Sequence, residues 1–367
     1  MKWSWKIARV AGIDVFMHTT FLLLVGFVAL TYWLNQGSVA AMLEGVLFLL
    51  ALFLCVLLHE FGHALTAQKY GIKTRDITLL PMGGVARLER MPEEPLQELW
   101  VALAGPLVNV VIAIMLWIGL VATNTFEPIT SLSVSQGNFF ERLLIVNVSL
   151  VLFNLLPAFP MDGGRVVRAL LATRMDYMRA THIAATLGQG IAFILGFIGL
   201  FSNPFLLFIA FFVWIGAGQE ASMVQVKSAL SGIPVNRAML TDFKSLEPTD
   251  PLSRPVQLIL AGSQHDFPVV TGSSVVGILT REALIRALSE HNENIFVSYI
   301  MQKDFQVVDS NQMLESVSQN FQTNNQSILP VVHNGRLVGL VTMENIGEFM
   351  MIQSAIRTRK VAGATNL

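Results

Sequence analysis

Six long apolar runs between positions 16 and 222 constrain this chain more than any other feature of its sequence. A transmembrane helix needs about 20 predominantly apolar residues to cross the hydrocarbon core of a bilayer. Each run is close to that length; they lie at residues 16–34, 42–66, 97–122, 139–158, 182–201 and 204–222. The sequence therefore predicts an α-helical polytopic membrane protein with about six transmembrane helices.

The composition agrees with this prediction and changes along the chain. Apolar residues make up 53% of the 367 residues, charged residues only 13%, and the mean hydropathy is +0.58, a balance typical of membrane proteins. Charged residues are sparse up to position 222 and more frequent beyond it. We therefore expect a membrane-embedded domain at 1–222 and a linker at 223–233.

Net charge and cysteine usage exclude two further features. A net charge of −1 gives no reason to expect a nucleic-acid partner. The only cysteine, Cys55, cannot form a disulfide within the chain, and its place inside an apolar run favours a small buried side chain over a reactive thiol.

Positive charges between the apolar runs predict the orientation in the membrane. Loops rich in Lys and Arg stay in the cytoplasm. Such loops precede the first run and follow the second, fourth and sixth, whereas the opposite loops carry only Arg142. We expect a multi-pass protein of the cell inner membrane with both termini in the cytoplasm. The alternative for the first run is a signal peptide cleaved near Ala40, but the run is long for one.

The second apolar run ends in the motif His59-Glu60-Phe61-Gly62-His63. Residues four apart lie on one face of an α-helix, so His59 and His63 can bind one ion together. Two neutral imidazoles and a carboxylate suit zinc, which in catalytic sites keeps a position for water. Glu60 can accept a proton from that water. The alternative is a helix end with polar residues at the interface, but such groups are costly there unless they pair or bind something.

Asp162 is the predicted third ligand. It lies in segment 154–164 (NLLPAFPMDGG), where two prolines and two glycines break the helix. Non-helical backbone at membrane depth is tolerated only within protein or beside a water-filled cavity. A broken helix that carries one acid is therefore interpreted as the wall of an active site. Without the histidine motif we would prefer the alternative, that Asp162 only caps the helix that follows.

Together these segments resemble the site-2 protease family of intramembrane zinc metalloproteases. The resemblance rests on the histidine motif, on Gly-Pro-Leu-Val-Asn at 105–109 and on 154–164. It implies one zinc ion per chain, bound by His59, His63 and Asp162. It also implies that Glu60 is the catalytic acid–base and that Asn154 helps to hold substrate backbone or the developing oxyanion. The implied activity is hydrolysis of peptide bonds in or near transmembrane segments, as in regulated intramembrane proteolysis.

Residues 77–88 resemble the membrane-dipping β-hairpin of the same family. Glycines in a strand let another backbone approach closely, and a free strand edge can bind an unwound substrate by strand addition. Gly83 and Gly84 are therefore candidate substrate-binding residues, and the alternative is an ordinary cytoplasmic hairpin. Asn109 is a further candidate for substrate binding, although Asn109 and Asn147 would more commonly form hydrogen bonds between helices.

From position 234 the sequence repeats itself at a fixed spacing. Met239, Pro268, Gly277 and Thr280 recur, each at the same separation, as Met301, Pro330, Gly339 and Thr342. Each copy is predicted as two β-branched strands followed by a helix, and a fixed period indicates two copies that pack on each other. The repeat resembles a tandem of cystathionine-β-synthase (CBS) modules. We expect this soluble α/β domain at 234–291 and 296–353, with a C-terminal tail at 354–367.

CBS tandems commonly bind an adenine nucleotide between the two copies and often form homodimers, so the resemblance implies both. In the family pattern an aspartate three residues after the threonine binds ribose hydroxyls; here Ala283 and Asn345 hold those positions. Thr280, Thr342 and Asn345 are the predicted nucleotide contacts. A purely structural or dimerising role is the alternative.

Two other classes of protein fit part of the sequence. CBS tandems also occur on channels and transporters, but the ionisable cluster at membrane depth has metalloprotease spacing. A scaffold that binds membrane proteins without cutting them would not need Glu60 or Asp162. We therefore expect a protease that works in the lipid bilayer on a membrane-protein substrate with a transmembrane helix. The CBS pair is expected to regulate it or to sense a nucleotide.

Overall fold

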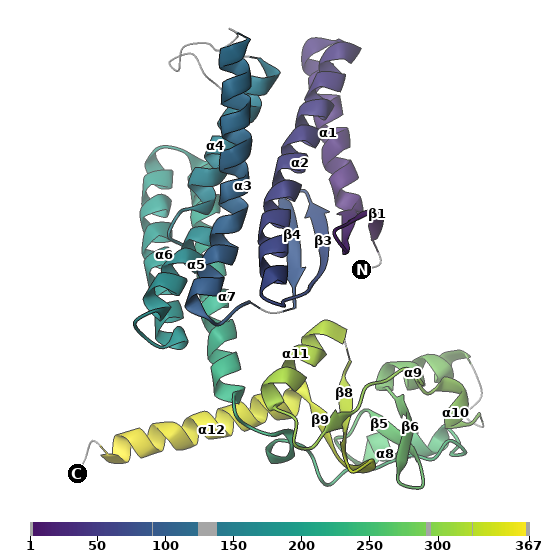
Figure 1. Ribbon diagram of the computed structural model, residues 1–367. Coiled ribbons are helices and arrows are strands. Elements are labelled where there is room, and N and C mark those ends of the chain that lie inside the picture. The colour runs from purple at the N-terminus through teal and green to yellow at the C-terminus, as the bar shows by residue number, and fades with distance from the viewer. Residues whose placement is uncertain (1–2, 90, 124–137, 291–294, 325, 365–367) are drawn as a thin grey trace. The chain divides into compact units, whose positions relative to one another are not determined.

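The computed structural model describes residues 3–89, 91–123, 138–290, 295–324 and 326–364 (Figure 1). The chain divides into two compact units, 1–224 and 225–367. The first unit is helical with one small sheet, and the second is built from short strands and helices.

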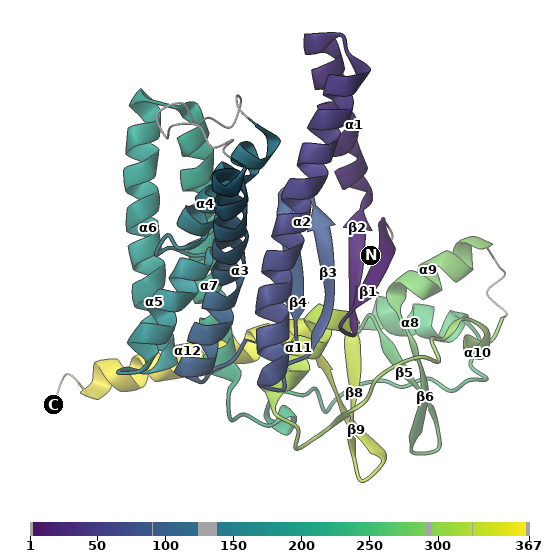
Figure 2. The ribbon, with the colours of Figure 1, turned by 45° about the horizontal axis from the view of Figure 1, so that its top comes forward.

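Long apolar helices make up most of the first unit, and Figures 1 and 2 show them running side by side. In chain order the helices of this unit are α1 (Thr19–Gln36), α2 (Val39–Lys69), α3 (Pro95–Ala122), α4 (Phe139–Asn154), α5 (Asp162–Ala172), α6 (Tyr177–Phe201) and α7 (Pro204–Leu230). Among the residues described, α1, α2, α3, α6 and α7 are the five helices long and apolar enough to cross a membrane.

The predicted span at 139–158 corresponds to α4, which has only 16 residues. At 1.5 Å per residue it is about 24 Å long, shorter than the usual span. It ends at Asn154 because Pro157 and Pro160 follow, and proline cannot donate the amide hydrogen bond that would continue a helix. Five helices of the described residues thus meet both length and composition, and a sixth span at α4 stays a prediction.

A four-stranded sheet lies beside α2, and half of it was not predicted. The strands are β1 (Ser4–Val10), β2 (Ile13–His18), β3 (Thr74–Leu80) and β4 (Gly83–Leu88), in the order β1-β2-β3-β4. β3 and β4 form an antiparallel hairpin that covers the predicted segment 77–88 and begins three residues before it, at Thr74. Residues before and at the very start of the first apolar run form β1 and β2, and β2 pairs with β3 in parallel. Whether the hairpin dips into the membrane stays a prediction.

The sheet packs on the helix that carries the histidine motif. Ile13 and Val15 of β2 and Ile77 of β3 form one buried cluster with Phe61 and Ala64 of α2. Fully burying side chains of this size contributes roughly 1.5–3 kcal/mol each. This packing places β4 next to α2 at the level of the motif.

A buried ion-pair cluster holds α5 against its neighbours. Nε of Arg168 donates to Oε1 of Glu98 on α3 at 2.7 Å, and its Nη1 donates to Oε1 of Glu220 on α7 at 2.7 Å. Arg168 and Glu98 are 1% and 0% exposed. Because removing one partner would leave a buried charge uncompensated, at a cost of about 3–5 kcal/mol, this cluster fixes the position of α5.

The second unit contains two similar halves, as the repeat predicts. The first half is α8 (Ser253–Ala261), β5 (Phe267–Thr271), β6 (Ser274–Leu279) and α9 (Arg281–Glu290), and α10 (Val297–Ile300) follows. The second is β7 (Val308–Asp309), α11 (Leu314–Asn324), β8 (Ile328–His333), β9 (Arg336–Thr342) and α12 (Met343–Ala364). β5–β6 and β8–β9 are antiparallel pairs, each followed by a helix.

The segment that begins each half pairs with a strand of the other half, and this contact explains the repeated Met and Gly positions. Leu240 exchanges two backbone hydrogen bonds with Leu340 of β9, and Gln302 does the same with Ile278 of β6. A side chain on Gly339 would lie 2.9 Å from the carbonyl oxygen of Leu240. Glycine is therefore required where the segment that begins one half crosses the strand of the other.

The predicted linker and tail are largely helical. α7 continues to Leu230 and so takes up most of 223–233, because Leu230 is 1% exposed and packs with Val235 and Leu314 in the core of the second unit. α12 likewise runs through the predicted module end at 353 to Ala364, and residues 365–367 of the predicted tail lie outside the described residues. The domain limits themselves stay predictions.

Candidate metal centre

Three predicted ligand atoms meet in the interior of the first unit. Nε2 of His59 lies 3.1 Å from Nε2 of His63 and 3.2 Å from Oδ2 of Asp162. Nε2 of His63 lies 3.1 Å from the same Oδ2. The three side chains come from α2 and from the first turn of α5, which are far apart in the chain. All three residues are buried. Among the described residues, they form a group that could hold a metal ion.

The broken segment before α5 places Asp162. Met161 is the N-cap of α5, so Asp162 lies in the first turn rather than capping it. A side chain on Gly163 would overlap the carbonyl oxygen of Leu156, and one on Gly164 would lie 2.6 Å from the amide nitrogen of Phe159. The two glycines therefore allow α5 to start directly against the loop that precedes it.

Hydrogen bonds fix how each imidazole faces the cluster. Nδ1 of His59 donates to Oδ1 of Asn109 at 2.5 Å, and Nδ1 of His63 donates to the carbonyl oxygen of Val101 at 2.7 Å. A neutral imidazole that donates from Nδ1 has a lone pair at Nε2. Both lone pairs therefore point at the centre, as in sites where histidine binds a metal.

This donor set fits zinc. Two lone pairs and a carboxylate oxygen lie within 3.2 Å of one another, and three acceptors this close together favour a cation among them. Tetrahedral zinc with ligands at about 2.0–2.2 Å would separate neighbouring ligand atoms by about 3.3–3.6 Å, slightly more than the distances here. The second carboxylate oxygen, Oδ1 of Asp162, lies 3.6 Å from Nη1 of Arg165. His59, His63 and Asp162 would thus hold the ion, as the sequence predicts.

Two glycines let α2 and α3 approach closely enough for this geometry. A side chain on Gly105 would overlap Nε2 of His63 and lie 2.6 Å from Nε2 of His59. A side chain on Gly62 would lie 2.7 Å from the carbonyl oxygen of Ala104. In the sequence both glycines belong to the motifs at 59–63 and 105–109. Their place inside helices, where glycine costs about 1 kcal/mol relative to alanine, was the signal that a close approach was needed.

Glu60 lies between α2 and the edge of the sheet. Its Oε2 accepts a hydrogen bond from the amide of Ala86 on β4 at 3.1 Å. A side chain on Gly84 would lie 2.7 Å from Cγ of Glu60, so this glycine leaves room for the glutamate itself. Gly83 has φ +136° and nothing near its missing side chain, and this backbone conformation favours glycine. Substrate binding by the two glycines stays a prediction.

The two predicted asparagines lie in different surroundings. Nδ2 of Asn154 donates to the carbonyl oxygen of Leu150 within α4 at 2.9 Å, and no described contact joins it to the metal ligands. Asn109 is fully buried behind His59. The predicted substrate contacts of both stay predictions, and for Asn109 the structure adds a role in orienting a ligand.

The predicted nucleotide contacts in the second unit cap their own helices. Oγ1 of Thr280 accepts from the amide of Ala283 at 3.2 Å, and Oγ1 of Thr342 accepts from the amide of Asn345 at 3.2 Å. The Thr342 hydroxyl also donates to Oδ1 of Asn345 at 2.7 Å. These hydrogen bonds give the side chains a structural role, and nucleotide binding stays a prediction.

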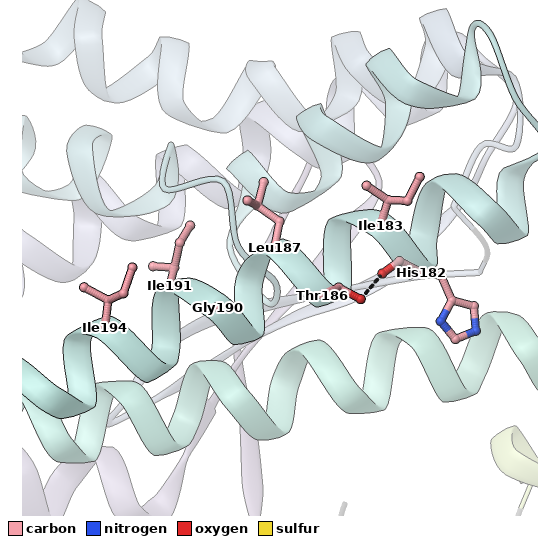
Figure 3. Close-up of a pocket in the computed structure, with 7 residues that line it drawn as sticks. All are labelled: His182, Ile183, Thr186, Leu187, Gly190, Ile191 and Ile194. Carbon is pink, nitrogen blue, oxygen red and sulfur yellow. Dashed lines mark hydrogen bonds between the residues drawn. The ribbon is translucent and has the colours of Figure 1, made fainter.

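An apolar pocket on α6 is separate from this centre. Figure 3 shows its lining: His182, Ile183, Thr186, Leu187, Gly190, Ile191 and Ile194. One polar interaction there, from Oγ1 of Thr186 to the carbonyl oxygen of His182 at 2.9 Å, lies within the helix. Because the lining contains none of the predicted site residues and no converging polar groups, we do not assign chemistry to it.

Comparison with known proteins decides the family. The model of peptidase family M50 matches residues 47–135 and 129–197, and the model of the CBS domain matches 233–290 and 297–351. A zinc metalloprotease of Methanocaldococcus jannaschii is 32% identical over 354 residues, which cover 96% of this chain and 97% of that protein. The chain belongs to peptidase family M50. It is a site-2-protease-like zinc metalloprotease with CBS domains.

A further relative and a solved structure are also similar to this chain. A Synechocystis protein described as a candidate zinc metalloprotease is 27% identical over 379 residues, which cover 95% of this chain and 96% of that protein. The solved site-2 protease from Methanocaldococcus jannaschii is 37% identical and covers 60% of this chain and 95% of its own, with a TM-score of 0.43. With its apolar helices, this M50 chain is an integral membrane metallopeptidase.

We predict that Gly105→Ala weakens zinc binding by at least about tenfold, because the added methyl group would displace both histidine nitrogens. Competition with a chromophoric chelator on the detergent-purified protein measures this. Gly119→Ala is the matched control, since it lies on the same helix with nothing within 4 Å of the added carbon. Equal zinc affinity in the two variants would contradict the close approach.

Proposed function

We propose that this chain is an intramembrane protease that hydrolyses peptide bonds in or near transmembrane segments of other membrane proteins, as in regulated intramembrane proteolysis. The observation that carries the proposal is the buried cluster of His59, His63 and Asp162, whose two histidines lie with Glu60 on a helix long enough to cross a membrane. When bound there, zinc supplies activation of water and polarisation of the peptide carbonyl.

Glu60 is the proposed acid–base. It adjoins His59 in α2, and its carboxylate faces the edge of β4. It would accept a proton from the attacking water and return one to the leaving amine. Burial of the neighbouring ligands keeps bulk water away, which strengthens electrostatic interactions at the reacting carbonyl.

The outer edge of β4 is the proposed place for the substrate backbone. β4 is the last strand in the sheet order, and its outer edge pairs with no other strand among the described residues. The amides of a transmembrane helix are bonded within the helix, so the substrate must unwind before a strand can pair here. Such a strand at Gly83 and Gly84 would lie next to Glu60.

We predict that Glu60→Gln abolishes cleavage while zinc content stays at the wild-type level. General acid–base catalysis contributes about 100- to 10,000-fold, and the amide of glutamine cannot accept the proton. A panel of single-span membrane substrates, scored for cleavage in proteoliposomes, provides the measurement. Glu89→Gln, an exposed glutamate just after β4, is the control. Wild-type cleavage by Glu60→Gln would remove the residue from the mechanism.

We predict that Gly84→Ala lowers cleavage by roughly 10- to 100-fold with zinc retained, because displacing a catalytic group by about 1 Å has effects of this size. The added carbon would lie 2.7 Å from Cγ of Glu60. Gly26→Ala on α1, where nothing lies within 4 Å, controls for the loss of a glycine. Unchanged cleavage by Gly84→Ala would contradict the idea that Gly84 leaves room for the catalytic position of Glu60.

For the second unit we propose a regulatory role, with an adenine nucleotide at Thr280, Thr342 and Asn345 and a homodimer formed through the CBS modules. The matching spacing of the two halves supports the cleft, whereas Ala283 lacks the carboxylate of the family pattern. Equilibrium dialysis of the full chain against ATP and AMP tests nucleotide binding, and no retention of either would leave the structural role.

We also propose that the protein lies in the cell inner membrane with both termini in the cytoplasm. The distribution of Lys and Arg between the apolar runs supports this orientation. Reporter fusions at the two termini test it, and an external reporter at either end would overturn it.

A further inference from the structure

Two fully buried amide side chains connect His59 to α4. Oδ1 of Asn109 accepts from Nδ1 of His59 at 2.5 Å, and Nδ2 of Asn109 donates to Oδ1 of Asn147 at 2.8 Å. Nδ2 of Asn147 donates in turn to the carbonyl oxygen of Leu143 at 2.9 Å and lies 3.4 Å from Sγ of Cys55. Both asparagines are 0% exposed, so water cannot replace any of these partners.

The carbonyl oxygen of Leu143 determines the direction of each hydrogen bond between Asn147, Asn109 and His59. The carbonyl oxygen of Leu143 can only accept, so the nitrogen of Asn147 must face it. The oxygen of Asn147 therefore faces Asn109 and requires a donor there. This places the nitrogen of Asn109 toward Asn147 and its oxygen toward His59. A backbone carbonyl of α4 thus determines, through two side chains, that Nδ1 of His59 carries the proton.

In His63 too the proton is on Nδ1, and here a single hydrogen bond places it. Its Nδ1 donates directly to the backbone carbonyl of Val101 at 2.7 Å, which cannot turn around. Asn109 can turn, because an amide presents an oxygen at one end and a nitrogen at the other. With its oxygen and nitrogen exchanged, it would offer N–H groups to Nδ1 of His59 and favour the imidazole that carries its proton on Nε2. That proton would point at the metal position.

We propose that Asn147 is a positioning residue of the metal centre, which keeps Asn109 turned so that His59 presents a lone pair to zinc. The proposal deepens the metal site and rests on zinc being its ion. The described hydrogen-bond partners of Asn147 are Asn109, Leu143 and Cys55, and none of them is a predicted metal ligand. An Asn147 that served only to join α3 to α4 would affect stability and leave metal affinity unchanged.

The experiment compares Asn147→Leu in two backgrounds. In the wild-type background it should weaken zinc binding by about tenfold or more, the usual effect of losing such an outer partner. In the Asn109→Asp background it should not weaken zinc binding by more than about threefold, because both carboxylate oxygens accept from His59 and the change only removes an Asn147 oxygen that has lost its donor. Zinc affinity is measured by chelator competition on the full chain in detergent, with the absorption spectrum of the cobalt-substituted protein as a second readout.

The controls separate positioning from stability. Thr181→Val removes a hydroxyl that is 1% exposed and donates within α6, so it matches the loss of a buried hydrogen bond away from the site. It should leave zinc affinity and the cobalt spectrum as in wild type. Equal losses from Asn147→Leu in both backgrounds, or no loss in the wild-type background, would overturn the proposal.

If Asn147→Leu does not yield folded protein, the more conservative Asn147→Asp is measured in its place. Asn147→Asp can still accept from Asn109, and its protonated form can also donate to Leu143. The proposal then requires zinc affinity within about threefold of wild type, and a loss of tenfold or more would overturn it. Either result is independent of cleavage, so the proposal can fail while the proposed proteolysis stands.

Discussion

Three electron-rich atoms lie within 3.2 Å of one another in the interior of the membrane domain: Nε2 of His59, Nε2 of His63 and Oδ2 of Asp162. In an environment that excludes water, such atoms stay together only if a cation or shared protons compensate their charge and lone pairs. Much of the surrounding structure meets this requirement. The ring nitrogens that face away from the centre are each bonded to an oxygen, which leaves the inner ones free to bind metal.

Packing brings these atoms together from separate helices. Gly62 and Gly105 let α2 and α3 approach closely, and the ion pair of Arg168 with Glu98 ties α5 to α3. The same helix α2 also meets the sheet, where Glu60 contacts the amide of Ala86. The predicted metal ligands, the proposed acid–base and the strand edge are thus positioned by one helix and its neighbours, and such rigid support is what a catalytic site needs.

The ligands were predictable from the sequence because their signal is local: His59 and His63 are one helical turn apart, and Asp162 is the acid in a broken helix. Strands β1 and β2 were missed because the parallel pairing of β2 with β3 joins segments that are separated in the chain by the whole of α1 and α2. The role of Asn109 toward His59 was missed for the same reason, since spacing along the chain does not show which helices face each other. The length of α7 depended on Leu230, whose burial in the second unit extends a helix that composition alone would have ended earlier.

The most direct test of the three-ligand centre is the zinc content of the detergent-purified protein, measured for the wild type and for Asp162→Asn after both are shown to be equally folded. The measurement requires no substrate. The account predicts close to one zinc ion per wild-type chain and a sharp reduction in the variant, because an amide is a far poorer zinc ligand than a carboxylate. A folded wild type that takes up no zinc, or a variant that retains it fully, would contradict the account.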